Sequence, residues 1–460
     1  MRFLFTTIPG FGHFHPLVPL AQALQAAGHT VAVATARSFA PFVERAGFEP
    51  IPAGLDWDES DLAATVPDIR SVPEEKQATW IMQRIFLDRS PQKIIPELIE
   101  VASTWRPDVV ISGTYEFGGA LVAEKLGLPY ASCSISYRWS RWILQHIVGG
   151  PVRRLRRAQG LPPDPEFQAF GRYLDLCFVP PTWTLTEALL RPEFTALLKR
   201  KLLSASSGRQ KVLCLRTLAL QRLMDLDRAR RARTAPEPST THFIRQTGLQ
   251  SGQSAPPEWL HDLARQPTVY VSLGTVFNSL YPQVFDTILA GLRDEPVNLI
   301  LTVGANGDPA RFGPQPANVR IERFIPQETL LPHVDLCINH SGYSTVMGAL
   351  GRGIPLVLLP LSADQPVIAQ MCFAAGVAPD LPDPVWRISS DGLPVVTPAR
   401  LTPAILREAA RQVLDRPEYR RAARTLQQQI QALPGLQHAV SLLERLNRER
   451  RPIIDSPNSV

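Results

Sequence analysis

A short polar loop in the last third of the chain follows a buried apolar run, and its residue types suit the binding of an anion. Residues 336–338 form the apolar run, which stops at Asn339. Residues 340–345 then supply an imidazole, hydroxyl groups and a glycine where the pattern predicts the start of a helix. The first turn of a helix has N–H groups without intrahelical partners and the positive end of the helix dipole, so a diphosphate fits there. The candidate ligands are His340, Gly342, Ser344 and Thr345.

A parallel strand and a second polar loop are expected after this helix. The helix continues to residue 350 and ends at two glycines, and residues 356–359 are typical of a strand buried on both faces. Pro360 ends the strand, and the following loop carries Asp364 and Gln365. A carboxylate and an amide at this position could hold sugar hydroxyls beside the phosphates. Each residue alone also has an ordinary structural explanation as a helix cap, but the combination favours a ligand site.

The order of these residues resembles the donor-binding signature of inverting nucleotide-sugar glycosyltransferases. His-x-Gly-x-x-Thr begins at His340, Ala-Leu-x-x-Gly-x-Pro begins at Ala349, and Pro-x-x-x-Asp-Gln ends at Gln365. The chain is most similar to the bacterial branch that modifies macrolides, polyketides and related small molecules. One departure is that residues 368–369 are Ile-Ala where the family often has Asn-Ala, which removes one polar helix contact. The resemblance implies an α/β protein of the GT-B class, with two Rossmann-like domains facing across a cleft.

The loop after the first strand carries a histidine that could act as a general base. Residues 2–7 are typical of a buried strand, and residues 8–15 form the loop that ends it. A hydroxyl is a poor nucleophile until its proton is being removed, and an imidazole titrates near neutral pH. The resemblance implies that His13 is this base, and His15 is the competing candidate.

An acidic residue orients the base in many relatives, and it is expected after the fourth strand. Here that strand, residues 108–111, is followed by Gly113 at the expected position, and Glu116 lies one helical turn later. Two interpretations stay open. Glu116 could orient His13 from a shifted backbone, or it could be an acid at a helix N-terminus, where the helix dipole favours it.

Two further segments of the second half are predicted to contact the donor. Residues 268–275 form a strand that ends in a small polar turn, and a second parallel strand follows at residues 299–304. The resemblance implies an aromatic platform for the nucleobase, with backbone groups beside it, although this aromatic could also be a core residue. The candidates are Ser272, Gly274 and Thr275 in the turn, and Phe324, Ile325 and Gln327 around the nucleobase.

Aromatic residues in the first half exceed what an α/β scaffold requires. They concentrate in insertions near residues 55–95 and 135–185, which suit a large apolar acceptor pocket. The candidate acceptor-binding residues are Trp57, Trp80, Phe86, Ser136, Trp139 and Trp142.

The length of 460 residues predicts two domains, because a single core of that size is unusual. We predict an N-terminal acceptor-binding domain over residues 1–228, an interdomain linker over residues 229–257 and a C-terminal donor-binding domain over residues 258–460. The linker is rich in Arg, Thr, Pro, Ser and Gln, although a short strand at residues 241–244 could lie within it. The GT-B architecture implies that the final helix crosses back to the first domain.

The composition limits the classes of function. The net charge of +6 comes largely from arginine clusters without a nucleic-acid motif, so solvated helix faces are expected rather than nucleic-acid binding. Five scattered cysteines without Cys-x-x-Cys spacing predict reduced thiols in a cytoplasmic protein and no zinc site. No signal peptide is expected, and no apolar run reaches the ~18 residues of a membrane span. The Asp-x-Asp triplets at residues 56–58 and 225–227 are expected to be surface acids.

These observations predict inverting, metal-independent transfer of a hexose or deoxyhexose from a UDP or dTDP sugar to a hydroxyl of a lipophilic small molecule. Polyketides, macrolides and phenolics are the expected acceptors, the nucleotide sugar is a co-substrate, and no cofactor is expected. Two other hypotheses stay open. One is a catalytically silent homologue that regulates a partner, and the other is an epimerase or lipid-linked transferase on the same fold. A need for an activator protein and the oligomeric state also stay open.

Overall fold

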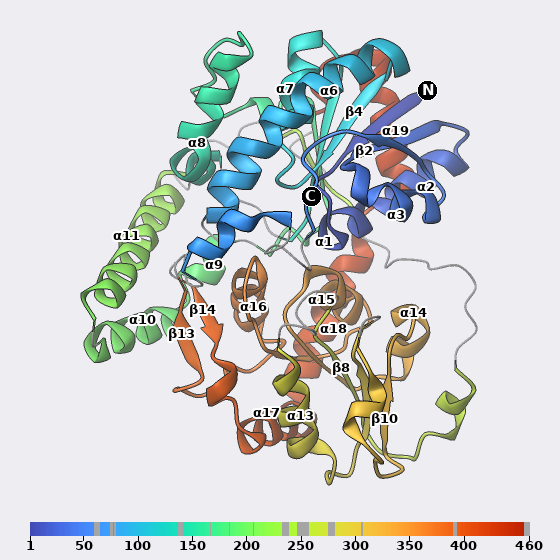
Figure 1. Ribbon diagram of the computed structural model, residues 1–460. Coiled ribbons are helices and arrows are strands. Elements are labelled where there is room, and N and C mark those ends of the chain that lie inside the picture. The colour runs from blue at the N-terminus through green and yellow to red at the C-terminus, as the bar shows by residue number, and fades with distance from the viewer. Residues whose placement is uncertain are drawn as a thin grey trace. The chain divides into compact units, whose positions relative to one another are not determined.

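The computed structural model of the chain (Figure 1) divides into two compact units, each with its own parallel sheet. The first unit comprises Met1–Thr184, Leu223–Gln246 and Leu433–Val460, and the second comprises Leu185–Arg222 and Thr247–Ala432. The structure describes residues 1–58, 65–73, 77, 80–136, 141–165, 167–183, 185–205, 207–231, 239–245, 257–274, 281–304, 307–389 and 393–454.

The first unit is built on a seven-stranded parallel sheet with the order β3-β2-β1-β4-β5-β6-β7. The central strands are apolar runs because helices cover both faces of the sheet. The strands are β1 (Arg2–Thr6), β2 (Thr30–Thr35), β3 (Glu49–Pro52), β4 (Val109–Gly113), β5 (Tyr130–Ser134), β6 (Leu174–Cys177) and β7 (Thr241–Phe243).

Helices on both sides of this sheet bury its apolar residues. The helices are α1 (Phe11–Phe14), α2 (Val18–Ala26), α3 (Ala40–Arg45), α6 (Ser90–Trp105), α7 (Gly118–Leu126), α8 (Arg141–Ala158) and α19 (Leu436–Glu449). Figure 1 shows α6 and α7 on one side of β4, with α2 and α19 on the other. Leu4 of β1 and Ala32 of β2 belong to one buried cluster with Ile94 of α6 and Leu121 of α7. On the other side, His29 holds α19 through a 2.9 Å contact between Nε2 and the Glu444 carboxylate.

The second unit contains a five-stranded parallel sheet with the order β10-β9-β8-β11-β12 and a small antiparallel pair, β13-β14. The strands are β8 (Thr268–Ser272), β9 (Asn298–Thr302), β10 (Val319–Glu322), β11 (Leu336–Asn339), β12 (Leu356–Leu358), β13 (Trp386–Ile388) and β14 (Pro394–Val396). The helices are α9 (Leu185–Leu189), α10 (Pro192–Ser204), α13 (Pro282–Leu292), α14 (Gln327–Leu330), α15 (Tyr343–Leu350), α16 (Gln365–Ala374), α17 (Pro403–Asp415) and α18 (Pro417–Ala432). Helix α11 (Gly208–Arg231) contributes residues to both units.

The compact units divide the chain differently from the predicted domain boundaries. Residues 185–222, predicted within the first domain, belong to the second unit. The guanidinium of Arg191 explains part of this difference, because it hydrogen-bonds Gln370 at 3.0 Å and Asp380 at 2.5 Å. These partners are far away in the sequence, so local patterns did not indicate them.

Two further segments of the chain contribute to the first unit. The predicted linker over residues 229–257 contains the end of α11 and strand β7, which pairs with β6. Residues 433–460 belong to the first unit, where the N–H of Ile453 donates to the Tyr173 carbonyl at 2.7 Å. Among the residues that the structure describes, no helix has the length and apolar character needed to cross a membrane.

Candidate functional site

The strand order of the second sheet reverses between β8 and β11. The chain runs from β8 through β9 to β10, returns to β11 on the other side of β8, and continues to β12. Ligands of open α/β sheets bind outside the carboxyl ends of the strands at such a place, because the loops leave in opposite directions there. Ser272 ends β8 and is paired with Asn339, which ends β11. The two predicted phosphate loops therefore begin side by side.

The imidazole of His340 lies between glycines from these two loops. A Cβ atom on Gly274 would be 2.6 Å from ring atoms of His340, and one on Gly342 would be 2.5 Å from Nε2. Gly274 also has a φ of 78°, which residues with side chains rarely adopt. The ring of His340 thus approaches both loops closely, and a glycine is needed at each of these two positions to leave room for it.

The turn between β11 and α15 is fixed by the protein itself. Oδ1 of Asn339 accepts a 2.7 Å hydrogen bond from the N–H of Ser341, whose φ is 67°. Gly342 is the N-cap residue of α15 and has no side chain with which to cap it. The first turn of α15, which includes the exposed Ser344 and the buried Thr345, therefore presents its N–H groups to an anion.

His340 is neutral at pH 7. Burial lowers its pKa from 6.5 to about 4, and a hydrogen bond to the backbone of Ser272 opposes this shift. A diphosphate bound beside the ring would raise the pKa again, because a nearby negative charge favours the protonated form.

Gln327 supports α15 from within the second unit. Its Nε2 donates to Thr345 Oγ1 at 3.2 Å and to the Tyr270 hydroxyl at 3.4 Å. The Tyr270 hydroxyl lies 3.0 Å from Thr302 Oγ1, which extends the network to β9. The NH₂ group of Gln327 is therefore engaged inside the protein, and the backbone groups near Ile325 and Gln327 remain the predicted nucleobase contacts.

Phe324 follows β10, and its side chain is 69% exposed. The alternative that this aromatic belongs to the core is therefore wrong. The neighbouring Ile325 is buried and anchors the segment. An exposed aromatic beside the carboxyl end of a strand can stack on a nucleobase, as the resemblance implies.

The loop before α16 is closed by Gln365. Its Oε1 accepts hydrogen bonds from the N–H groups of Leu361 at 2.9 Å and Ser362 at 3.2 Å. Asp364 is the N-cap residue of α16. Because the amide oxygen of Gln365 is occupied, its NH₂ group is the part that could donate to a sugar hydroxyl.

The first sheet reverses between β1 and β4, and His13 lies in α1, just after β1. Its ring centroid is 6.1 Å from the rings of Phe86 and Tyr115, in edge-on contacts. Phe86 and Tyr115 stack on each other at 5.8 Å. Burial lowers the pKa of His13 from 6.5 to about 4, so the ring is unprotonated at pH 7, as a base must be.

The backbone of Thr114 is a partner of His13 that our sequence analysis missed. The hydrogen bond between them raises the pKa of His13 against the effect of burial, as expected when the ring N–H donates to a carbonyl. The Thr114 hydroxyl donates to the Cys133 carbonyl at 3.0 Å and accepts from the N–H of Ile135 at 3.0 Å. These bonds fix the loop after β4 to β5. The position of Thr114 and Tyr115 at the carboxyl end of β4, opposite β1, is the signal that could have identified them.

The carboxylate of Glu116 binds the start of α7. It accepts from the N–H groups of Gly118 at 2.6 Å and Gly119 at 2.9 Å, from the Ser112 hydroxyl at 3.2 Å, and from the Thr6 hydroxyl. His13 is not one of these four donors. Of the two open interpretations, this geometry matches an acid at a helix N-terminus, and the predicted catalytic role has no contact with His13 to support it.

His15 has different surroundings from His13. Its ring lies 5.1 Å from that of Phe11 and 6.1 Å from that of Phe14. Burial lowers the pKa of His15 to about 4 as well. The pKa values therefore do not separate the two histidines, whereas the contacts with Phe86 and Tyr115 belong to His13.

Three of the predicted acceptor-binding residues share one apolar cluster. Trp57 and Phe86 are buried in it, with ring centroids 5.6 Å apart, and Trp80 packs against it. Tyr115 also packs against this cluster, which connects it to His13. Ser136 is buried at the end of β5 with a φ of 66°.

Three predicted site residues are not described in full. Thr275 and Trp139 lie outside the described residues, as does the side chain of Trp142. Within the described part of the chain, no group of three or more His, Cys, Asp or Glu residues is arranged to hold a metal ion.

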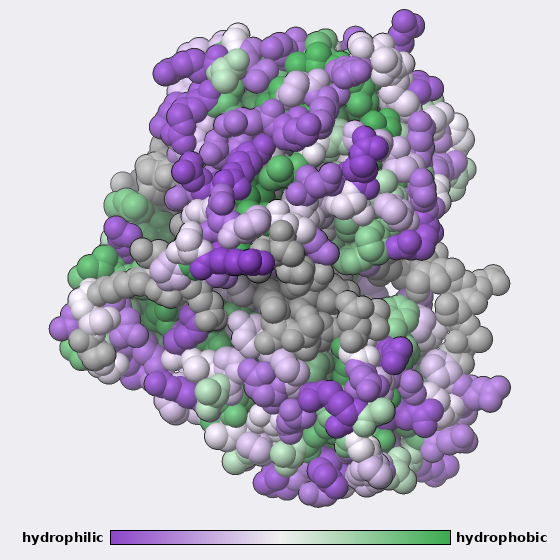
Figure 2. Space-filling model, viewed as in Figure 1, coloured by the Kyte–Doolittle hydropathy of each residue, from purple (hydrophilic) through white to green (hydrophobic). Residues whose placement is uncertain are grey.

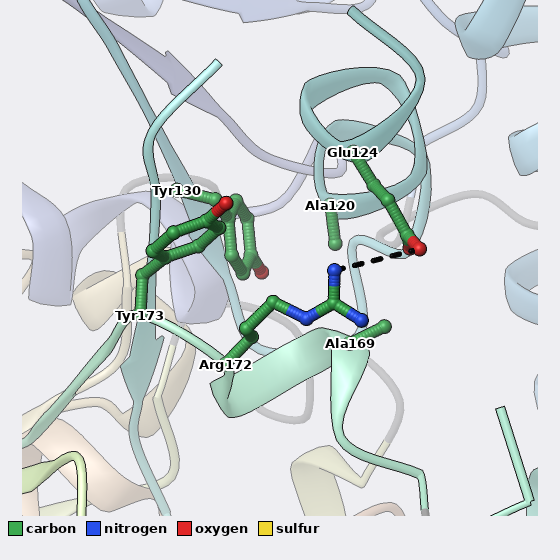
Figure 3. Close-up of a pocket in the computed structure, with 6 residues that line it drawn as sticks. All are labelled: Ala120, Glu124, Tyr130, Ala169, Arg172 and Tyr173. Carbon is green, nitrogen blue, oxygen red and sulfur yellow. Dashed lines mark ion pairs between the residues drawn. The ribbon is translucent and has the colours of Figure 1, made fainter. Parts of the chain in front are cut away.

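A small pocket is lined by residues of α7, β5 and the segment 169–173, none of which belongs to the apolar cluster beside His13. Figure 3 shows its lining, in which the Arg172 side chain points toward Glu124, with an ion pair of 3.8 Å. Its volume is about 10 Å³, which is close to the space needed by one water molecule. This pocket is too small for an acceptor.

Comparisons with known proteins agree with this arrangement. The family model for the N-terminal domain of Erythromycin biosynthesis protein CIII-like proteins matches residues 22–161, and the model for their C-terminal domain matches residues 287–446. The 4'-demethylrebeccamycin synthase of Lentzea aerocolonigenes is 28% identical, over 97% of this chain and 99% of that protein. The 3-alpha-mycarosylerythronolide B desosaminyl transferase of Saccharopolyspora erythraea is 26% identical, over 98% of this chain and 99% of that protein.

Solved structures share the fold. The glycosyltransferase VinC in complex with dTDP has a TM-score of 0.67 and 21% identity, with 98% of this chain and 100% of that chain covered. Spinosyn forosaminyltransferase SpnP also has a TM-score of 0.67, with 97% and 99% covered at 21% identity. Together the two family models match more than half of the chain, which therefore belongs to the EryCIII-like glycosyltransferases, the bacterial natural-product branch of the GT-B nucleotide-sugar glycosyltransferases.

Proposed function

We propose that this enzyme transfers a hexose or deoxyhexose from UDP or dTDP to a hydroxyl of a lipophilic natural product, with inversion at the anomeric carbon and without a metal ion. The observation that carries this proposal is the uncapped start of α15 beside the His340 ring at the carboxyl ends of β8 and β11. The names of the two relatives, a rebeccamycin synthase and a macrolide desosaminyl transferase, support an acceptor of this class. The dTDP complex of VinC supports a nucleoside diphosphate donor.

In the proposed reaction, the acceptor oxygen attacks the anomeric carbon as the bond from that carbon to the diphosphate oxygen breaks. His13 takes the hydroxyl proton, and its low pKa keeps it unprotonated beforehand. The leaving diphosphate gains negative charge, which the first-turn N–H groups of α15 stabilise. His340 adds to this effect, because the developing charge favours its protonation.

The test is a mass-spectrometric screen of UDP and dTDP sugars against phenolic and macrolide acceptors, run with and without EDTA. We expect a glycosylated acceptor of inverted anomeric configuration, in an amount that EDTA does not lower. The matched control is His13→Ala, which should form little product while still binding the donor. Loss of activity in EDTA with recovery in magnesium would show that stabilisation of the leaving group depends on a metal ion. Retained anomeric configuration would exclude direct displacement of the diphosphate by the acceptor oxygen.

A further inference from the structure

Helix α11 exposes several large apolar side chains to solvent. Among the described residues nine large hydrophobic side chains are exposed, and four of them lie on this helix: Val212 (47%), Leu215 (53%), Leu223 (40%) and Leu226 (65%). The opposite face is buried and mixes the apolar side chains of Cys214 and Met224 with the polar side chains of Thr217 and Gln221. A helix that only covered its own protein would bury the leucines and expose the polar groups.

The exposed apolar residues form a narrow stripe. Together with the exposed Ala219 they recur along α11 in steps of three, four, four and three residues. This is the spacing by which one helix packs along another, with a small residue where two backbones approach. We call residues 212, 215, 219, 223 and 226 the α11 stripe.

Basic side chains border the α11 stripe. Lys211, Arg216 and Arg222 are exposed next to it, and none of them makes an ion pair with a residue that the structure describes. In Figure 2, hydrophobic and strongly hydrophilic residues lie side by side at the left edge, where α11 runs in Figure 1. A second copy of this helix would bring like charges together, whereas acidic side chains on a partner would be attracted.

A lipid surface fits these observations less well than a helix does. A helix that lies in a membrane interface presents a broad apolar face, commonly with tryptophan or phenylalanine. The α11 stripe is narrow, has charged residues beside it, and α11 contains no aromatic residue.

We propose that the α11 stripe is a docking surface for an amphipathic helix of another protein, with leucine-type residues at the contact and acidic residues beside them. The leucines of this enzyme would pack between those of the partner, and Lys211, Arg216 and Arg222 would pair with its carboxylates. This surface is separate from the residues assigned to sugar transfer.

A synthetic peptide of four heptads with Leu at a and d and Glu at e and g serves as the probe. Its like charges prevent it from pairing with itself, so it is available for a basic partner. We expect the full-length enzyme to bind the labelled peptide in fluorescence anisotropy, with an affinity that falls as salt rises. A peptide with Lys at e and g should bind at least tenfold more weakly.

The variants Leu215→Glu and Leu226→Glu should each weaken binding of the acidic peptide by at least tenfold. Leu203→Glu is the matched control, because Leu203 is 86% exposed but lies on α10. This variant should bind the acidic peptide as tightly as the unchanged enzyme does. Turnover should be the same in all three variants. Three results would overturn the proposal: equal binding of both peptides, an oligomer in sedimentation that Leu215→Glu dissociates, or co-sedimentation with phosphatidylglycerol vesicles without peptide binding.

Discussion

Two imidazoles carry different parts of the proposed reaction although their pKa values are alike. Burial lowers the pKa of both His13 and His340 to about 4. The unprotonated state of His13 is the form that accepts a proton. In the proposed reaction His340 becomes easier to protonate when the diphosphate binds, because the charge of the ligand favours the protonated ring. The neighbours of each ring, rather than its own pKa, therefore decide its role.

Replacing His13 with Ala should lower the rate of the chemical step by roughly 10²–10⁴, the usual contribution of a general base. Binding of the nucleotide sugar, measured by calorimetry, should stay near that of the unchanged enzyme, because the proposed donor residues belong to the other unit. His15→Ala is the control and should cost much less. Full activity of His13→Ala on an ordinary alcohol acceptor would remove the base from the mechanism.

Glu116→Gln should affect stability rather than the chemical step. A glutamine would turn its NH₂ group toward one of the N–H or hydroxyl donors that the carboxylate now accepts from. We expect a loss of about 1–3 kcal/mol of unfolding free energy, measured by denaturant titration, and an unchanged pH profile of kcat.

Thr114→Val provides the comparison for Glu116→Gln. It removes the hydroxyl that bridges Cys133 and Ile135, so the loop that holds His13 should become less ordered. We expect kcat to fall, with only a small loss in the free energy of unfolding. If Glu116→Gln instead lowered kcat without lowering stability, Glu116 would regain the role of orienting the base.

At the scale of elements, both sheets place their functional loops where the strand order reverses. In the second unit this brings the turn after β8 beside the turn after β11. The parallel arrangement is what directs both loops to the same edge. The glycines of these turns are needed because the His340 ring occupies the space that a Cβ atom would require.

Gly274→Ala should therefore weaken binding of the bare nucleoside diphosphate by about tenfold or more, since each tenfold step is ~1.4 kcal/mol. Gly313→Ala is a matched control, because Gly313 also has a positive φ, 64°, but a Cβ there would have no atom within 4 Å. Both changes place a side chain on a residue with a positive φ, and only Gly274→Ala brings a Cβ atom against the His340 ring. If calorimetry showed equal losses of affinity in both variants, the positive φ alone, and not the contact between residue 274 and the His340 ring, would account for the effect.

At the scale of the whole molecule, buried histidines make stability depend on pH. Burial lowers the pKa values of His13, His15 and His340 from 6.5 to about 4. Between these two values the unfolded chain binds more protons at these positions than the folded chain does. The contribution of these histidines to the free energy of unfolding is therefore complete above about pH 6.5, and it is lost as the pH falls toward 4.

We expect the melting temperature to decrease steadily from pH 6.5 to pH 4.5 in differential scanning calorimetry. Each such histidine contributes at most ~1.4 kcal/mol per pH unit. His15→Phe is a useful comparison because the ring already packs among Phe11 and Phe14, and it should make the decrease shallower. A decrease of the same slope in His15→Phe would assign the pH dependence to other groups.

Local patterns in the sequence determined the strands and turns that carry the donor site. Apolar runs that end at Ser272 and Asn339 predicted β8 and β11, because parallel strands covered on both faces must be apolar throughout. Proline and glycine at residues 434–435 lie at the break between α18 and α19, where a proline cannot continue a helix. Each of these signals lies within a few residues of the feature that it predicts.

Only the tertiary structure decided which groups meet. Three features depend on contacts between distant parts of the chain. They are the hydrogen bond from Thr6 to the Glu116 carboxylate, the backbone of Thr114 that holds His13, and the membership of residues 185–222 in the second unit. The exposure of leucines on α11 belongs to the same class, because the sequence contains these leucines but does not show which side of the helix packs against the protein. Spacing along the chain specifies which residues share a face of an element, and packing against the rest of the protein decides what that face touches.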